Sequence, residues 1–183
     1  MNAIPLLLIA LLGLLPQAPS AFKSSTAPLS DALRTSLAAA SKNLAGSSEL
    51  MPAEKYGFHP TPAQMTFGQL VVHIVQTNIA LCSGISGSAS PLSPAELQSM
   101  SGAGTKETLV ASMKRSFDYC TEALSKVDDS HLAEEVTMFG RSAGLSRAAA
   151  MMILAADWAD HYSTAASYLR LNDILPPSAQ PKK

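Results

Sequence analysis

The stretch "AADWADHYSTAASYLRLND", residues 155–173, has the spacing of an amphipathic helix but carries polar groups on the face that should be apolar. Steps of three and four residues select that face, which comprises Leu154, Asp157, His161, Thr164, Tyr168 and Leu171. Asp157 and His161 are one turn apart, and we expect both to face inward. A buried carboxylate or imidazole is costly without a partner. The segment therefore predicts a bundle helix that carries a functional pair.

Capping residues and helix breakers bound four long helical stretches. We place them roughly at residues 30–50, 66–83, 106–127 and 146–172. Thr66 and Gln69 have capping-box spacing at the start of the second stretch. Ser93 predicts the cap of one short helix in the following loop, with Pro94 in its first position. Residues 128–144 follow no periodic pattern, so we expect them to be irregular and the chain to be all-α.

The two cysteines predict how two of these helices are arranged. Cys82 and Cys120 lie at about the same depth, roughly fifteen residues into the second and third helices, so parallel helices would bring them to one level. The connecting loop is long enough to cross the bundle. We expect a disulfide between them, because the N-terminal sequence discussed next predicts export to an oxidising compartment, where disulfides persist. The alternative is two buried free thiols, which behave as small hydrophobic side chains.

The N-terminus predicts export. Residues 5–15 form an apolar run followed by small residues, which is the pattern of a signal peptide. We therefore expect residues 1–20 to be a signal peptide and residues 21–183 to be a single domain that is periplasmic or secreted. The run is too short for a permanent membrane span. The alternative is a disordered or membrane-associated apolar tail.

The charge balance limits the partners. A formal net charge of −1 and a pI near 6.4 provide no basic field for a phosphate backbone, so we exclude nucleic acid as a partner. No phosphate loop, Ser-His-Asp signature or haem motif is present in the sequence. A small-molecule substrate remains the favoured partner, and a homodimer stays open.

His73 completes a candidate metal site. It interrupts the apolar run "GQLVVHIVQTN", residues 68–78, and would meet Asp157 and His161 in one layer if the second and fourth helices were antiparallel. Two histidines and one carboxylate leave coordination positions open. Without a metal, we expect their ligand atoms within roughly 3 to 4.5 Å of one another. The alternative is an ion pair between Asp157 and His161 on a half-buried helix face.

Other polar and aromatic residues have simpler explanations. We expect His59 to be an exposed loop residue and His131 to be solvated in a polar connection. Asp160 is predicted to be a surface carboxylate, Gln69 a capping residue, and Trp158 a packing residue at a helix interface.

Three segments resemble the DinB/YfiT-like superfamily, in particular its exported bacterial members: "MPAEKYGFHPTPAQMTFGQLVVHIVQTN", "FDYC" and "DHYSTAASYLRLNDILPP". The resemblance implies a four-helix bundle in up-down-down-up order, with helices two and three parallel. The family's metal triad has one histidine on helix two and an H-x-x-x-H pair on the last helix. His73 matches the first and His161 the last, whereas Asp157 stands where the family normally has histidine. Ser163 and Thr164 stand where it often has Gly-Gln.

The resemblance implies a divalent metal, with zinc or nickel favoured and iron or manganese as alternatives. It further implies a metal-dependent transferase or hydrolase that acts on a small thiol-type substrate. The alternative is a non-enzymatic exported bundle with a degenerate site, which binds metal or a partner protein. The sequence names neither the substrate nor the metal.

Overall fold

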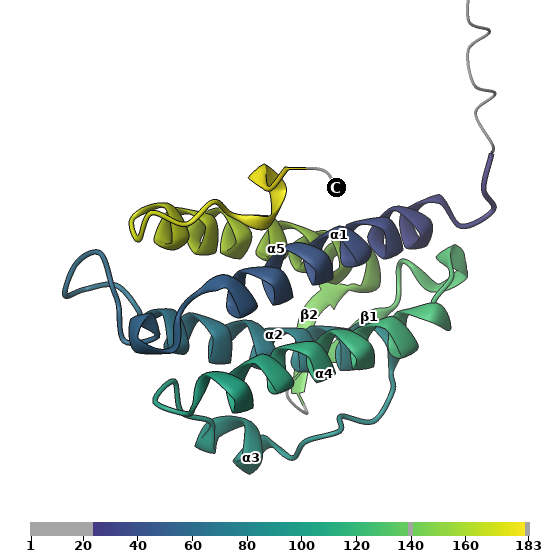
Figure 1. The fold of residues 1–183 in the computed structure, drawn as a ribbon. Helices are drawn as coiled ribbons and strands as arrows, with labels where there is room; N and C mark the ends of the chain where they lie inside the picture. Colours follow the sequence, from purple (N-terminus) through teal and green to yellow (C-terminus); the bar gives the residue numbers. More distant parts are fainter. Residues whose placement is uncertain (1–23, 139–140, 182–183) are drawn as a thin grey trace, which may run out of the picture.

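The computed structural model describes residues 24–138 and 141–181, and the predicted signal peptide, residues 1–20, lies outside them. Four long helices pack as a bundle (Figure 1), namely α1 (Pro28–Leu50), α2 (Phe67–Ser86), α4 (Lys106–Ser125) and α5 (Arg147–Arg170). Short helical elements lie in the connections, namely η1 (Ala53–Lys55), α3 (Pro94–Ser99) and η2 (Asp129–His131), and η3 (Pro177–Ala179) follows α5.

Capping signals set the starts of α2 and α3, whereas α1 begins two residues earlier than predicted and α4 and α5 each end two residues earlier than predicted. Thr66 and Gln69 form the predicted capping box at the start of α2, and Ser93 forms another with Glu96 at the start of α3. The predicted end of α2 before Gly84 was wrong, because the helix continues to Ser86. Gly87, with φ of 69°, ends it in the left-handed conformation that glycine adopts without strain.

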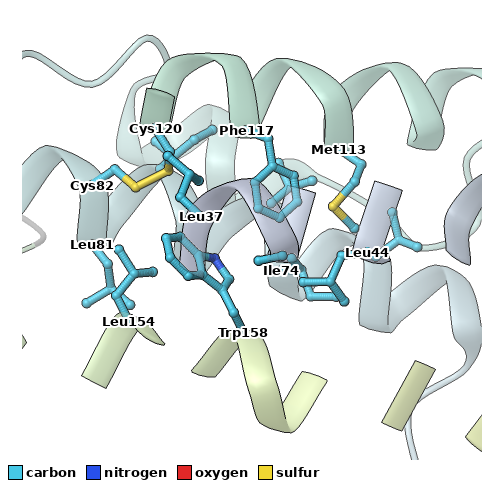
Figure 2. Close-up of a cluster of buried hydrophobic side chains, with 14 of the residues drawn as sticks. Leu37, Leu44, Ile74, Leu81, Cys82, Met113, Phe117, Cys120, Leu154 and Trp158 are labelled. Atoms are coloured by element: carbon cyan, nitrogen blue, oxygen red, sulfur yellow. A yellow bond between two sulfur atoms is a disulfide. The ribbon is translucent and has the colours of Figure 1, made fainter. Parts of the chain in front are cut away.

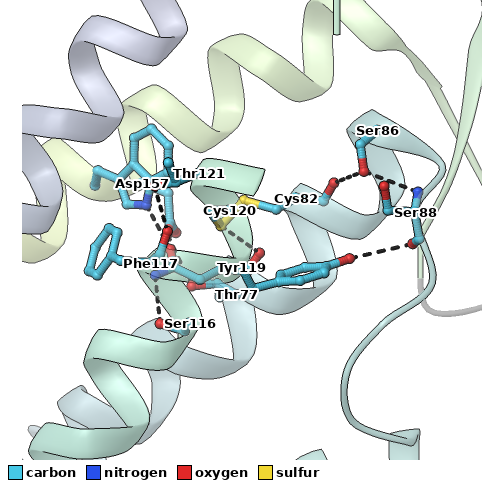
Figure 3. The surroundings of a disulfide bond; sticks show 12 residues. Thr77, Cys82, Ser86, Ser88, Ser116, Phe117, Tyr119, Cys120, Thr121 and Asp157 are labelled. Atoms are coloured by element: carbon cyan, nitrogen blue, oxygen red, sulfur yellow. Dashed lines mark hydrogen bonds between the residues drawn. A yellow bond between two sulfur atoms is a disulfide. The ribbon is translucent and has the colours of Figure 1, made fainter. Parts of the chain in front are cut away.

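Two cross-links show that α2 and α4 are parallel. The Asn78 side chain donates a hydrogen bond to the Ser116 hydroxyl at 3.0 Å. Four residues further along both helices, a disulfide joins Cys82 to Cys120, with 5.3 Å between the Cα atoms (Figure 3). From the first contact to the second, the residue number rises by four on each helix, so the two helices are parallel. This is the arrangement that the cysteine depths predict.

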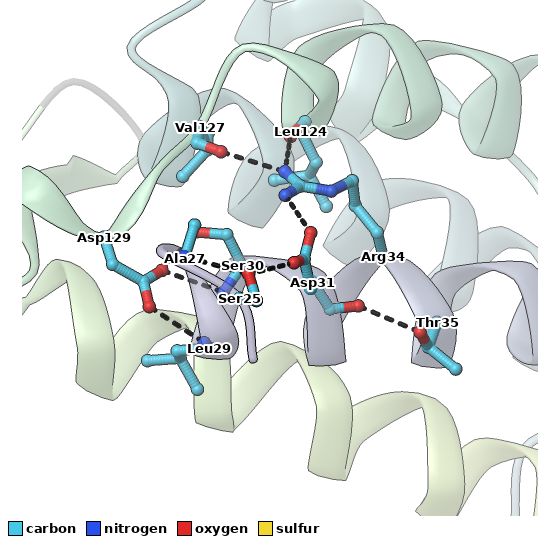
Figure 4. Close-up of polar contacts among 10 residues, drawn as sticks. All are labelled: Ser25, Ala27, Leu29, Ser30, Asp31, Arg34, Thr35, Leu124, Val127 and Asp129. Atoms are coloured by element: carbon cyan, nitrogen blue, oxygen red, sulfur yellow. Dashed lines mark hydrogen bonds and ion pairs between the residues drawn. The ribbon is translucent and has the colours of Figure 1, made fainter. Parts of the chain in front are cut away.

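Helix α1 is antiparallel to α4. The Arg34 guanidinium, near the start of α1, donates hydrogen bonds to the carbonyls of Leu124 and Val127 at the end of α4, at 3.0 and 2.9 Å (Figure 4). Glu49, at the other end of α1, pairs with Lys114 in the first half of α4 at 2.5 Å. Leu124 is in the last turn of α4, where carbonyls lack an i+4 partner within the helix, and Val127 follows the helix.

A carboxylate from a distant connection caps α1. The N-cap residue Ala27 provides no side-chain hydrogen bond. Instead, Asp129 accepts hydrogen bonds from the Leu29 and Ser30 amides, both at 2.9 Å, and from the Ser30 hydroxyl at 2.6 Å (Figure 4). This contact ties the connection between α4 and α5 to the start of the bundle and places a negative charge at the positive end of α1.

A β-hairpin corrects the all-α prediction. Strands β1 (Glu135–Met138) and β2 (Arg141–Ser146) form a two-stranded antiparallel sheet in the segment that we predicted to be irregular. An isolated hairpin of this size is marginally stable, so tertiary packing decides whether it forms. Val136 supplies that packing because it is buried in the same core cluster as the helices.

The core lies between the four long helices. Figure 2 shows part of it, with Leu37, Leu44, Ile74, Met113, Phe117, Leu154 and Trp158 in one cluster. The disulfide is inside this core, since both of its cysteines are fully buried. Helix α2 is apolar and long enough to cross a bilayer, but two-thirds of its most apolar window is buried against the rest of the protein. Its hydrophobicity is therefore explained by its place in the bundle.

Candidate metal centre

The structure brings the three predicted ligands together. His73 on α2 contacts His161 on α5. Thr77, four residues later on α2, contacts Asp157, four residues earlier on α5, so the two helices are antiparallel. One ligand atom from each of His73, Asp157 and His161 lies within 4.8 Å of the others. This spread is slightly wider than our limit of about 4.5 Å. All three residues are partly buried.

The Asp157 carboxylate divides its two oxygens between two partners. Oδ1 lies 3.2 Å from Nε2 of His161, one turn along α5. Oδ2 accepts a hydrogen bond from the Thr77 hydroxyl of α2, also at 3.2 Å (Figure 3). The side chains of Asp157 and His161 are 20% and 13% exposed, so neither is freely hydrated. The carboxylate is consequently held from both sides of the gap between the two helices.

His161 has a buried nitrogen with an unused hydrogen-bonding capacity. Its Nε2 has no hydrogen-bond partner within the described part of the chain, because Oδ1 of Asp157 is close but not well aligned with the ring nitrogen. Its other nitrogen, Nδ1, lies 3.7 Å from the carboxylate of Asp160, which is 80% exposed. A proton on Nδ1, facing Asp160, leaves the Nε2 lone pair directed into the site. A metal ion is the kind of partner that would satisfy it.

The two histidines have opposite pKa shifts. Burial lowers the pKa of His73, and the neighbouring His161 lowers it further against the smaller opposing effect of Asp157. The interaction with the Asp157 carboxylate raises the pKa of His161, which outweighs the effect of burial. His73 is therefore the more readily available neutral donor, and a metal would have to displace the proton that Asp157 favours on His161.

The site lies at the edge of the buried face of α5, which corrects the predicted inward seam. Leu154 and Tyr168 are buried as expected. Leu171 lies beyond the end of the helix and is 61% exposed, and Thr164 is only partly buried. The spacing rule extended the apolar face too far because it assumed a continuous stripe. An edge position leaves the side chains of Asp157 and His161 partly exposed, although Nε2 of His161 is buried.

The remaining sequence candidates lie outside the triad. His59 is exposed, and its Nδ1 contacts the Thr61 carbonyl at 2.8 Å. His131 is also exposed, and it pairs with Glu134 at 2.6 Å. Asp160 is at the surface as predicted, although it faces Nδ1 of His161. These positions leave His73, Asp157 and His161 as the set that the fold brings together.

A buried hydrogen-bond chain beside the triad was not predicted. The Trp158 indole donates to Oδ1 of Asn78 at 2.7 Å, and the Asn78 amide donates to Ser116. Trp158 directly follows Asp157 in the sequence, and Asn78 directly follows Thr77. An asparagine in an apolar helix face is a sequence signal for such a chain, but its partners on two other helices are known only from the fold.

The donor set fits a divalent metal. Two imidazole nitrogens and one carboxylate oxygen suit zinc and several first-row transition metals. Two ligand atoms that bind a tetrahedral zinc at about 2.0 to 2.2 Å lie about 3.3 to 3.6 Å apart. A separation of 4.8 Å therefore has to contract by roughly 1.2 to 1.5 Å when the ion binds. Side-chain rotation at a partly exposed edge can supply that change.

Comparisons with known proteins agree with this architecture. A family model described as the DinB superfamily matches residues 36–165, which is more than half of the chain. Among solved structures, a DinB-like protein from Bacillus cereus ATCC 10987 superposes with a TM-score of 0.64 and 16% sequence identity, covering 84% of this chain and 97% of that chain. At this identity the match supports the fold. A search of curated proteins found no match.

Proposed function

The chain belongs to the DinB superfamily, and from that premise we propose that it is a metal-dependent enzyme with His73, Asp157 and His161 as ligands to one divalent ion. The observation that carries the proposal is the buried Nε2 of His161, which has no hydrogen-bond partner among the described residues and lies beside two other donor groups. Zinc and nickel are the favoured metals, and iron or manganese are alternatives.

The reaction class is transfer or hydrolysis on a small thiol-type substrate. A bound divalent ion lowers the pKa of a coordinated thiol or water. His73 and His161 contribute neutral donors, and Asp157 contributes one negative charge. Three protein donors leave room for a substrate atom. The helix packing behind the site keeps water away from one side of it, which strengthens electrostatic interactions there.

We place the organic part of such a substrate in a cavity further along α2, which none of the three triad residues lines. It has a volume of about 440 Å³, and its lining includes Ala80 and Gly84 of α2 and Arg147 of α5. Ala80 and Gly84 share a helix face with His73 and Thr77, and Ala80 lies about one turn beyond Thr77. The volume is within the range of small-molecule sites. This placement supports a small molecule as the partner.

We also propose that the protein is exported. The signal-peptide pattern of residues 1–20 motivates this, and the Cys82–Cys120 disulfide supports it, because disulfides persist in oxidising compartments. Fractionation of the native host with mass spectrometry of the N-terminus tests the proposal. A mature chain that begins near Ala21 outside the cytoplasm is expected, and an intact Met1 on cytoplasmic protein would contradict it.

One observation favours a non-enzymatic alternative. The 3.2 Å contact between Asp157 and His161 compensates both groups electrostatically when the histidine is protonated. A degenerate site of this kind could bind metal or a partner protein without turnover.

A turnover assay separates the two functions. Metal-loaded wild-type protein and His161→Ala are assayed for transfer and hydrolysis reactions on a panel of small thiols. The enzyme proposal expects turnover that requires metal and is lost in His161→Ala. Stoichiometric metal binding without turnover on any thiol would favour the non-enzymatic alternative.

A further inference from the structure

The Thr77 hydroxyl and the His161 ring contact different oxygens of the Asp157 carboxylate. It donates to Oδ2 at 3.2 Å, whereas Oδ1 lies 3.2 Å from Nε2 of His161. The oxygen that faces the histidine is thus distinct from the oxygen that α2 holds. Oδ1 accepts no hydrogen bond from Thr77, whereas Oδ2 has one of its lone pairs engaged and its orientation fixed by that bond, so Oδ1 is the freer oxygen for a metal.

Thr77 has two acceptors within reach and one proton to donate. The Ile74 carbonyl also lies 3.2 Å from its hydroxyl oxygen. That carbonyl is the acceptor of an intrahelical hydrogen bond in α2, whereas the Asp157 carboxylate carries a charge, and charge-assisted hydrogen bonds are about twice as strong as neutral ones. The proton is therefore directed to Oδ2 of Asp157.

The hydrogen bond between Trp158 and Asn78 fixes the separation of α2 and α5 beside Thr77. Trp158 follows Asp157 on α5, and Asn78 follows Thr77 on α2. The Trp158 indole donates to Asn78 at 2.7 Å, and Asn78 is fully buried. Since Asn78 is also bonded to Ser116 of α4, its orientation is fixed from two sides. The two helices are consequently held at one separation at the level of the carboxylate.

We propose that Thr77 is a positioning residue that restricts Asp157 to binding the metal through a single oxygen, Oδ1. This rests on the metal centre proposed above. With one oxygen from Asp157 and one nitrogen from each histidine, the protein supplies three donors and the ion keeps a low coordination number. Removal of the hydroxyl frees Oδ2, so the carboxylate can bind through both oxygens and occupy a position that a substrate would otherwise use.

Cobalt(II) absorption tests the proposal, because four-coordinate cobalt absorbs visible light much more strongly than five- or six-coordinate cobalt. Wild-type protein, Thr77→Val and Thr77→Ser are loaded with cobalt(II). We expect the intense four-coordinate spectrum in the wild type and in Thr77→Ser, which keeps a hydroxyl. Thr77→Val should show weaker visible bands and a cobalt affinity reduced by about 10- to 100-fold, which is typical when a group that orients a ligand is lost.

Thr121→Val is the matched control. The Thr121 hydroxyl bonds to the Phe117 carbonyl within α4 and does not contact the triad, so this variant should keep the wild-type spectrum. Circular dichroism verifies folding, and Thr77→Ala replaces Thr77→Val if valine disturbs the helix. A wild-type spectrum in a folded protein that lacks the Thr77 hydroxyl would overturn the role of Thr77. Failure of the wild type to bind cobalt would contradict the metal centre itself.

Discussion

The imidazole rings of His73 on α2 and His161 on α5 lie 4.8 Å apart between their centroids and are inclined by 72°. Two protonated rings at this distance repel each other, so the first proton bound by the pair disfavours the second. Asp157 contacts His161 and thereby decides which ring takes that first proton. In this pair, His161 therefore binds the first proton and His73 stays neutral.

The two histidines of the metal-free protein should titrate on opposite sides of the ordinary value of 6.5. His161 should titrate above it because of Asp157, and His73 below it because of burial. NMR titration of the ring protons measures both pKa values. Asp157→Asn should lower both, and that of His161 more. A His73 that titrates above His161 would refute the assignment.

The pKa shifts of His73 and His161 also determine how the stability of the metal-free protein depends on pH. The contribution of His161 to the free energy of unfolding is present below pH 6.5 and is lost as the pH rises through its raised pKa. The contribution of His73 is present above pH 6.5 and is lost as the pH falls through its lowered pKa.

Asp157→His should preserve or tighten zinc binding. The substitution replaces a carboxylate with a third imidazole, which restores the ligand set that the family resemblance implies. Competition titration with a chromophoric zinc chelator measures the affinity. Asp157→Leu, which removes the donor at similar volume, is the control and should bind zinc more weakly. Equal affinities in Asp157→His and Asp157→Leu would mean that this position is not a ligand.

Removal of the disulfide should lower the free energy of unfolding by about 4 kcal/mol on the chain-entropy model. The bond closes a long loop, since Cys82 and Cys120 are separated by 38 positions. Urea unfolding of the Cys82→Ala/Cys120→Ala double variant, compared with the unreduced wild type, gives the difference. Unchanged stability in the double variant would show that the bond does not constrain the unfolded chain.

Asp129→Asn should lower the melting temperature at neutral pH, and the loss should shrink in acid. Burial raises the pKa of Asp129, but the hydrogen bonds from Ser30 and Leu29 outweigh this effect and lower it below 3.8. Its contribution is therefore present above pH 3.8 and is lost as the pH falls through the lowered pKa. Calorimetry between pH 2 and pH 7 is the test, and Glu122→Gln is the control because Glu122 is exposed and pairs with Lys126, the residue that follows α4. A difference in melting temperature between the wild type and Asp129→Asn that does not change with pH would exclude a charged cap.

The sequence could predict those features that depend on local spacing. The capping boxes at Thr66 and Ser93 set helix starts correctly, since a cap is a contact between residues three apart. The equal depth of Cys82 and Cys120 predicted parallel helices, because depth along a helix follows from residue number. The three triad residues were found by the same reasoning, together with the family resemblance.

Features that depend on distant partners could not be predicted. The cap of α1 comes from Asp129, which lies about one hundred positions away. The β-hairpin forms because Val136 is buried in the core, and the polar residues around it conceal the strand pattern. Thr77 lies four residues after His73, on the same face of α2, but its contact with Asp157 depends on the exact separation of two helices.

Metal content tests the central claim most directly. Protein purified without a His tag is stripped of metal, reloaded with zinc, dialysed and examined by elemental analysis. We expect one zinc per chain in the wild type and none in His73→Ala and His161→Ala, with circular dichroism showing that both variants remain folded. His59→Ala, which removes an exposed histidine outside the triad, should retain one zinc. Zinc retained at one per chain in His161→Ala, or absent from the reloaded wild type, would contradict the metal centre.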